Sequence, residues 1–432
     1  MGTPTKASES GARRGCFFST NHHQFSEKKG FEMCFITCKL RIMKVKLLAL
    51  LLTFTAINTY GQRFLYPVFT TVNITSNITY GNALNYKNQN QVLKLDFYEP
   101  TGDTVNKRPL IIYMHGGGFT DINQSKTLPH IKMFCDSFAL RGYAVASIDY
   151  RLDTALSNRA VINAMHDARA AVRFFKANAA IYKIDTAKIF MGGESAGAIS
   201  SLNVNYIHKP GELLYPSVAP YNTNGTVEGN SGNPGYSSKT KATLCFCGGT
   251  KTAALDPVFD TTAMQVSDPP LLQLHGTSDP VIPVQYGLAI AIRAKNVGIP
   301  FLFYPLYGAT HCPWFYSLPN WSVYLDTLIQ YTAAFLHPAV VITGIDVMEV
   351  QAKSINIFPN PFSSSTMLKA NESLMGATLT MYNALGQLVK QIEKMDGQTI
   401  ILDRENLPSG MYFIYLTEDH KVIKVDKVII TD

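Results

Sequence analysis

Hydrophobic positions along residues 63–340 alternate between strand-like and helix-like patterns. Leu93, Leu95 and Phe97 alternate with polar residues, which is typical of a half-exposed strand. Short apolar runs predict buried strands at 110–114, 143–148, 189–191, 242–247, 271–274 and 301–305. Apolar residues at helical spacing predict helices at 128–140, 158–178, 285–295 and 321–336. Strands that alternate with helices predict an α/β fold, with a mostly parallel sheet covered by helices on both faces.

The pattern changes at about residue 341. Residues 341–354 are expected to form a linker, and residues 355–432 contain short alternating strands separated by Gly, Asn and Pro turns. This is typical of a small all-β sandwich domain. Inside the first domain, residues 208–241 are rich in Gly, Asn, Ser and Pro, which predicts a long loop or a cap insertion.

Residues 43–61 have the pattern of a secretory signal peptide. Lys44 and Lys46 precede an apolar run of eleven residues, 47–57, and small and polar residues follow. The run is too short to cross a bilayer, which takes about 20 residues, so no transmembrane helix is predicted. Residues 1–42 are then an N-terminal extension of doubtful status, and Met43 is the expected true start. The predicted catalytic domain covers residues 62–340.

Composition and charge narrow the function classes. The chain of 432 residues carries a formal net charge of +7. Residues 1–61 hold nine basic and three acidic residues, so the other 371 residues carry only +1. The body of the protein therefore lacks the basic character of a nucleic-acid-binding protein. The seven cysteines show no zinc-site spacing, so no metal is predicted. Cys245, Cys247 and Cys312 are interpreted as buried packing residues.

The sequence Gly193-Glu194-Ser195-Ala196-Gly197 follows a predicted strand and opens a predicted helix. This is the context of a nucleophile elbow, in which a tight turn exposes a serine hydroxyl at the edge of the sheet. Side chains at the two glycines would clash with neighbouring backbone. The N–H of Ala196 would face a developing oxyanion.

A glycine run, His115-Gly116-Gly117-Gly118-Phe119, follows the predicted strand 110–114. Backbone N–H groups can approach a substrate oxygen closely where there is no side chain. Two N–H groups from this glycine run, together with that of Ala196, would make an oxyanion hole with three donors. The alternative for any glycine run is a flexible turn.

Two further residues complete a candidate catalytic triad. Asp279 lies in a loop after the predicted strand 271–274, and His311 lies in a loop after the strand 301–305. The order Ser195, Asp279, His311 is that of the α/β hydrolases. Asp256, Asp260 and Asp268 compete for the role of the acid, but none directly follows a clear buried strand. His275 is expected to be a structural hydrogen-bonding residue.

The triad predicts a mechanism that needs no cofactor. His311 would take the proton of Ser195 during attack and return it to the leaving group. Asp279 would orient the imidazole and stabilise the imidazolium. An acyl-enzyme would form and then be hydrolysed by water.

Four segments resemble α/β-hydrolase carboxylesterases and lipases of the hormone-sensitive-lipase-like and type-B esterase groups. They are HGGGF at 115–119, SIDYRL at 147–152, DARAAVRFFKANAA at 167–180 and GGESAG at 192–197. The resemblance covers residues 90–337. It implies a serine carboxylesterase with oxyanion donors at Gly117 and Gly118, and a structural role for Asp149, Tyr150 and Arg151.

The C-terminal region resembles the type IX secretion sorting domain of Gram-negative bacteria. The resemblance is carried by IFPNP at 357–361, YNALGQLV at 382–389 and LPSGMY at 407–412. It implies interaction with the secretion machinery and a location outside the cell or on the outer surface. The domain would then be removed or would anchor the protein. A carbohydrate-binding β-sandwich is the rival interpretation, but the few aromatic residues offer no flat platform.

The favoured function is hydrolysis of a small-molecule or polysaccharide-linked carboxylic ester. Two alternatives stay open. A dipeptidyl-type serine peptidase shares the triad, although it usually has a large β-propeller before the hydrolase domain. A catalytically inactive binding protein of hydrolase fold is the other alternative. Activity towards simple esters separates these cases.

Overall fold

The computed structural model describes residues 63–209, 212, 227–250, 259–315, 317–341, 355–383, 388–418 and 421–432. The predicted N-terminal extension and signal peptide lie outside these residues, as does the predicted linker from residue 342 onward.

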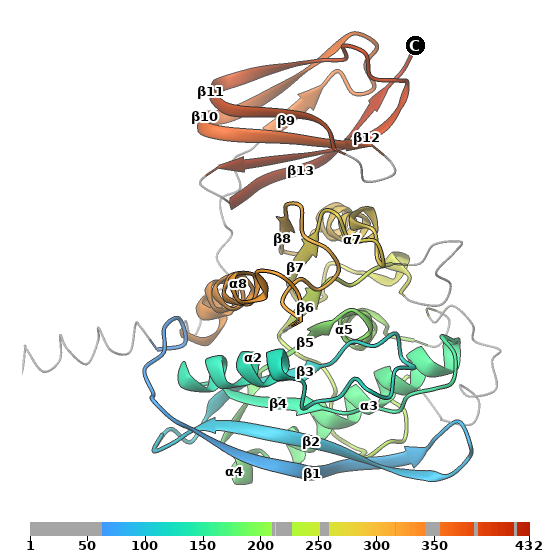
Figure 1. Ribbon diagram of the computed structural model, residues 1–432, viewed down its shortest axis with the longest axis vertical. Helices are drawn as coiled ribbons and strands as arrows, with labels where there is room; N and C mark the ends of the chain where they lie inside the picture. Colours follow the sequence, from blue (N-terminus) through green and yellow to red (C-terminus); the bar gives the residue numbers. More distant parts are fainter. Residues whose placement is uncertain are drawn as a thin grey trace, which may run out of the picture. The chain divides into compact units, whose positions relative to one another are not determined.

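The first domain contains one eight-stranded sheet with the order β1-β2-β4-β3-β5-β6-β7-β8 (Figure 1). Its strands are β1 (Val72–Leu84), β2 (Asn90–Pro100), β3 (Arg108–Met114), β4 (Ala144–Ile148), β5 (Ile184–Glu194), β6 (Ala242–Phe246), β7 (Leu271–Gly276) and β8 (Phe301–Leu306). The pairs β1–β2 and β2–β4 are antiparallel, and the other pairs are parallel. The mostly parallel sheet confirms the predicted α/β fold.

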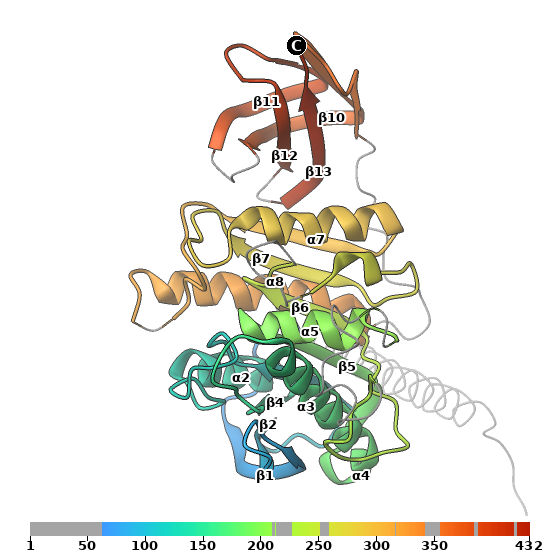
Figure 2. The same cartoon turned by 90° about the vertical axis from the view of Figure 1, so that its right-hand side faces the viewer.

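Helices cover both faces of this sheet, with α2 and α8 on one side and α3, α5 and α7 on the other (Figures 1 and 2). The helical elements are α2 (Pro129–Leu140), α3 (Asn158–Ala177), α4 (Ala179–Tyr182), α5 (Ala196–Tyr206), η2 (Thr261–Ala263), α7 (Val284–Val297) and α8 (Trp321–Val341). Each face of the sheet has its own hydrophobic core, and successive side chains of β3 belong to one core and then to the other. Leu110 and Ile112 pack with α3 and α5, whereas Ile111 and Tyr113 pack with α2 and α8. Strand β3 is therefore buried on both faces, as its unbroken apolar run predicts.

The parallel strands end at the same edge of the sheet. Met114 of β3 is in register with Gly193 of β5, and Glu194 is in register with Phe246 of β6. Gly276 of β7 pairs with Leu306 of β8. The loops that follow these strands therefore start close together, which is where open α/β sheets hold their ligands.

The C-terminal region forms an antiparallel sheet of five strands. They are β9 (Ile355–Phe358), β10 (Ser365–Asn383), β11 (Leu388–Asp403), β12 (Gly410–Glu418) and β13 (Lys421–Ile430). The first part of β10 pairs with β9 and its last part pairs with β12, while β11 follows both parts with several register shifts. These strands enclose their own hydrophobic core, which includes Leu368, Leu379 and Ile414. The all-β architecture of this region is confirmed.

Three features of the described residues complete the fold. Residues 227–241 form turns without a helix or strand, as expected for that part of the 208–241 segment.

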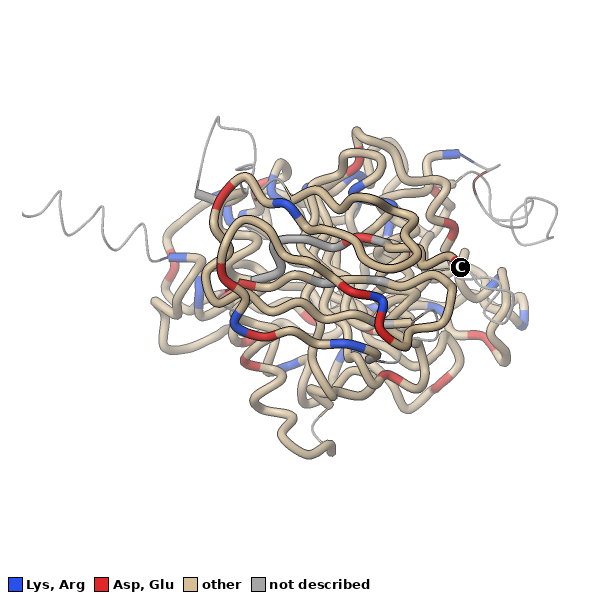
Figure 3. The backbone as a smooth tube through the Cα atoms, turned by 90° about the horizontal axis from the view of Figure 1, so that it is seen from above, with Lys and Arg blue, Asp and Glu red and all other residues tan. Residues whose placement is uncertain are grey.

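Basic and acidic residues are interspersed along the described chain (Figure 3). Within the described parts, none of the helices combines the length and the apolar character needed to span a membrane.

Candidate active site

Ser195 lies on the sharp turn between β5 and α5. Its backbone has φ 51° and ψ −116°, a conformation that costs free energy for a residue with a side chain. A Cβ atom on Gly193 would lie 2.6 Å from the carbonyl oxygen of Met114, and one on Gly197 would lie 2.3 Å from the same oxygen. Only glycine fits at these two positions, because the turn packs directly against the end of β3. This is the geometry of a nucleophile elbow.

The structure brings Ser195, His311 and Asp279 into one chain of hydrogen bonds. His311 Nε2 lies 2.9 Å from Ser195 Oγ, and His311 Nδ1 lies 2.7 Å from Asp279 Oδ2. Ser195 and Asp279 are largely buried, while the His311 side chain keeps 14% of its surface exposed. The imidazole therefore bridges a hydroxyl group and a carboxylate at the edge of the sheet.

The surroundings of Asp279 favour its ionised form. Burial alone would raise the pKa of this carboxyl, but hydrogen bonds from His275 and His311 outweigh burial and hold the pKa well below its usual range. The backbone N–H groups of Val281 and Ile282 both donate to Oδ1 at 2.9 Å. His275 also donates from Nε2 to the carbonyl oxygen of Ile282 at 2.7 Å, so it holds the Asp279 loop, in agreement with its predicted structural role.

The competing aspartates are engaged elsewhere or not described. Asp260 accepts from the backbone N–H of Thr262 and caps η2. Asp268 lies 2.6 Å from His208 Nε2. Asp256 lies outside the described residues.

The glycine loop after β3 lies against the nucleophile. A Cβ atom on Gly116 would be 3.3 Å from Ser195 Cβ. Gly117 and Gly118 adopt φ values of 102° and 58°, which favour glycine. Ala196 is the first residue of α5, and the first N–H groups of a helix have no partner within the helix. Gly116, which directly precedes the predicted donors Gly117 and Gly118, therefore lies against Ser195, and the third predicted donor, Ala196, is the residue after Ser195.

Tyr150 holds the glycine loop in place through hydrogen bonds and ring stacking. Its hydroxyl donates to the carbonyl oxygens of His115 at 2.9 Å and Gly116 at 3.1 Å, and its ring stacks on that of His115 with centroids 4.4 Å apart. The carbonyl of Gly116 and the N–H of Gly117 belong to one planar trans peptide and point in opposite directions. By holding the carbonyl, Tyr150 also orients the N–H. These contacts agree with the structural role that the resemblance implies for the DYR segment.

A buried carboxylate directly before the nucleophile was not singled out by the sequence pattern. Glu194 accepts from Trp314 Nε1 at 2.7 Å, His130 Nε2 at 2.9 Å and the hydroxyl of Tyr113 at 3.2 Å. Burial raises the pKa of Glu194, but the charge and hydrogen bond of His130, with the hydrogen bonds of Trp314 and Tyr113, outweigh it and lower the pKa. Trp314 lies three residues after His311, so this carboxylate joins the elbow to the histidine loop.

Two family models match this chain, one in the α/β domain and one in the C-terminal β domain. Residues 95–213 match the BD-FAE family model, and residues 356–431 match the model described as "Secretion system C-terminal sorting domain". A search of the curated proteins finds no match. The chain therefore carries an esterase-type α/β-hydrolase domain and a C-terminal sorting domain. The sorting domain indicates secretion to the cell surface or to the outside.

Two solved structures illustrate the likeness of the fold. Thermogutta terrifontis esterase 2 phosphoramylated by tabun is 21% identical, with a TM-score of 0.50, over 65% of this chain and 98% of that chain. The same esterase phosphonylated by cyclosarin is 20% identical, with a TM-score of 0.50, over 64% of this chain and 97% of that chain. At these identities the likeness concerns the α/β-hydrolase fold.

Proposed function

We propose that this protein is a secreted serine esterase that cleaves carboxylic esters through an acyl-enzyme. The observation that carries the proposal is the continuous chain of hydrogen bonds from Ser195 Oγ through His311 to Asp279 at the end of β5. A serine hydroxyl becomes an effective nucleophile when a base removes its proton during attack, and His311 Nε2 is within reach for this role.

The reaction starts when Ser195 Oγ attacks the ester carbonyl while His311 takes the hydroxyl proton. The backbone N–H groups of Gly117, Gly118 and Ala196 stabilise the oxyanion of the tetrahedral intermediate. His311 then gives its proton to the leaving alcohol, and the acyl group stays on Ser195. Water, activated by the same histidine, hydrolyses the acyl-enzyme and restores the free serine.

Asp279 serves this reaction through His311. Its ionised carboxylate accepts the Nδ1 hydrogen, which leaves Nε2 free to receive the proton of Ser195. Because hydrogen bonds lower the pKa of Asp279, the carboxylate stays ionised over the pH range in which an imidazole can act as a base.

The substrate is proposed to be a small-molecule or polysaccharide-linked ester outside the cell. Secretion supports an extracellular substrate, and the match to an esterase-type family supports an ester rather than an amide. The likeness to Thermogutta terrifontis esterase 2 adds a solved esterase with the same fold. Secretion machinery is the proposed partner of the C-terminal domain, which is then removed or anchors the protein.

The test is hydrolysis of p-nitrophenyl acetate and butyrate by the full chain and by Ser195→Ala. The wild type is expected to release p-nitrophenol, and the variant to lose nearly all of this activity. Dipeptidyl p-nitroanilides tested in parallel separate a peptidase from an esterase. Hydrolysis of peptide but not ester substrates would favour the peptidase, and no hydrolysis of either would favour a binding protein. A panel of short, long and aromatic acyl esters then defines the acyl group.

A further inference from the structure

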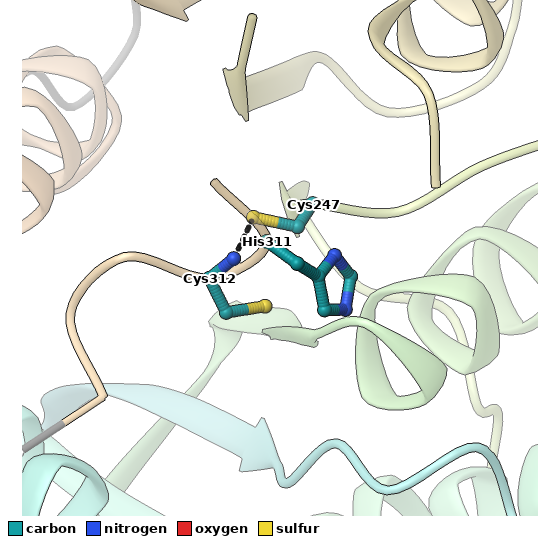
Figure 4. Close-up of side chains that lie close together, drawn as sticks. All are labelled: Cys247, His311 and Cys312. Atoms are coloured by element: carbon teal, nitrogen blue, oxygen red, sulfur yellow. Dashed lines mark hydrogen bonds between the residues drawn. The ribbon is translucent and has the colours of Figure 1, made fainter. Parts of the chain in front are cut away.

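Two cysteines lie beside the proposed catalytic histidine. Cys247 follows the last residue of β6, and Cys312 follows His311 in the chain; both are fully buried. Their sulfur atoms and a ring nitrogen of His311 all lie within 4.8 Å of one another (Figure 4). The backbone N–H of Cys312 donates to Cys247 Sγ at 3.1 Å. The sulfur of Cys247 therefore already contacts the backbone of the histidine loop.

Both cysteines have a strained backbone. Cys247 has φ 53° and Cys312 has φ 44°, in the left-handed region that residues with a side chain rarely adopt. Such conformations persist where surrounding contacts hold them. These two positive-φ turns hold the sulfur atoms of Cys247 and Cys312 within 4.8 Å of each other, next to His311.

The location of the protein outside the cytoplasm allows Cys247 and Cys312 to form a disulfide. The sorting domain directs the chain out of the cytoplasm, and disulfides form and persist in extracytoplasmic compartments. Burial raises the pKa of the Cys312 thiol, and the neighbouring Cys247 raises it further. Since the thiolate is the reactive form, the folded reduced protein resists oxidation. The bond therefore has to form while the chain folds, before the thiols are buried.

We propose that Cys247 and Cys312 form a disulfide when the chain folds outside the cytoplasm, and that this bond fastens the His311 loop to the end of β6. One thiolate attacks an external small-molecule or protein disulfide and forms a mixed disulfide, releasing one thiol. The second cysteine displaces the remaining external thiol. The two cysteines lose two protons and two electrons, and the external disulfide is reduced to two thiols.

The other described cysteines fit this role less well. In the structure, all four described cysteines, Cys135, Cys245, Cys247 and Cys312, are buried free thiols. Cys245 belongs to the hydrophobic cluster on the opposite face of the sheet from Cys247 and Cys312. Cys135 lies within α2 and does not belong to the group of side-chain atoms within 4.8 Å of one another that Cys247, His311 and Cys312 form. A metal held by Cys247, His311 and Cys312 would compete with Ser195 or Asp279, because both ring nitrogens of His311 already have partners.

The experiment refolds the purified full chain from denaturant with either reduced or oxidised glutathione. Free thiols are then alkylated under denaturing conditions, and peptides are mapped by mass spectrometry without reduction. Refolding with oxidised glutathione is expected to give a peptide pair linking Cys247 to Cys312, with Cys135 alkylated. The linked protein is expected to have a Tm higher by roughly 5 °C or more than the reduced protein.

Cysteine variants show whether the redox-dependent change in Tm comes from the disulfide or from the packing of the two thiols. In the double variant Cys247→Ala/Cys312→Ala, the two refolding conditions are expected to give the same Tm, whereas Cys135→Ala keeps the redox-dependent shift. If the double variant does not fold, peptide mapping of the wild type still decides. Alkylation of both Cys247 and Cys312 after oxidative refolding would overturn the proposal. Alkylation of these two only after a chelator is added would indicate a bound metal and would also overturn it.

Discussion

Glu194 offers a sharp test of how the nucleophile and histidine loops are held together. Replacement by Gln keeps the shape of the side chain but removes its charge. The Gln oxygen can still accept from Trp314 and Tyr113, while its NH₂ group faces His130, which donated to the carboxylate. Neutral hydrogen bonds contribute about 1 kcal/mol less than charged ones, so two weakened bonds cost about 2 kcal/mol. The unsatisfied contact with His130 adds about 1–3 kcal/mol.

We therefore expect Glu194→Gln to reduce the free energy of unfolding by roughly 3–5 kcal/mol at pH 7. Folding lowers the pKa of Glu194 from its reference value of 4.5. The ionised group thus stabilises the fold above about pH 4.5, and this contribution is lost as the pH falls through the lower folded pKa. The difference between wild type and variant should shrink accordingly in acid.

The assay is urea unfolding of both proteins at pH 7 and at several lower pH values. Glu228→Gln is the matched control, because the Glu228 carboxylate also accepts a hydrogen bond from a basic side chain, that of Arg173 at 2.9 Å, but is half exposed. That control is expected to cost less than about 1 kcal/mol. A Glu194→Gln protein as stable as the wild type at pH 7, or a deficit that does not change in acid, would refute the reasoning.

Three further predictions concern the proposed machinery. Asp279→Asn should lower kcat by about 10³–10⁴ with circular dichroism unchanged, since the amide favours the wrong imidazole tautomer; wild-type turnover would exclude Asp279 as the acid. Tyr150→Phe removes the donor to the carbonyls of His115 and Gly116, so kcat/KM for p-nitrophenyl butyrate should fall roughly five- to thirtyfold; an unchanged value would show that the loop holds itself. Gly197→Ala places a Cβ 2.3 Å from the Met114 oxygen, so Tm should fall by roughly 5 °C or more in a thermal scan; a wild-type Tm would contradict the tight elbow.

The sequence predicts the central part of the fold well because buried parallel strands are locally apolar. The runs at 110–114 and 271–274 coincide with β3 and β7. Strand β1 was not predicted, since it lies at the edge of the sheet and its residues Val72–Leu84 are mostly exposed and polar. The long strand β10 is not predicted as one strand, because its two parts face different partners and its apolar alternation is interrupted.

The candidate catalytic triad could be predicted from the sequence because each of its residues follows a locally apolar strand. Ser195, Asp279 and His311 each follow a predicted strand, and parallel strands bring their ends to one edge. The partners of Glu194 could not be predicted, because His130 lies 64 residues before it and Trp314 lies 120 residues after it. Only tertiary packing brings those donors together. The sequence offered one signal for a buried carboxylate here: Glu194 lies inside the serine motif, beside a strand that is buried on both faces.

The most direct test of the central claim is to locate the covalent adduct left by an organophosphate. The full chain is incubated with the reagent until ester hydrolysis stops, and its peptides are mapped by mass spectrometry. We expect one adduct, on Ser195, whose occupancy follows the loss of activity, and no adduct at that site in His311→Ala. Complete inactivation with an unmodified Ser195, or with the adduct on a neighbouring serine such as Ser200, would contradict the proposed nucleophile.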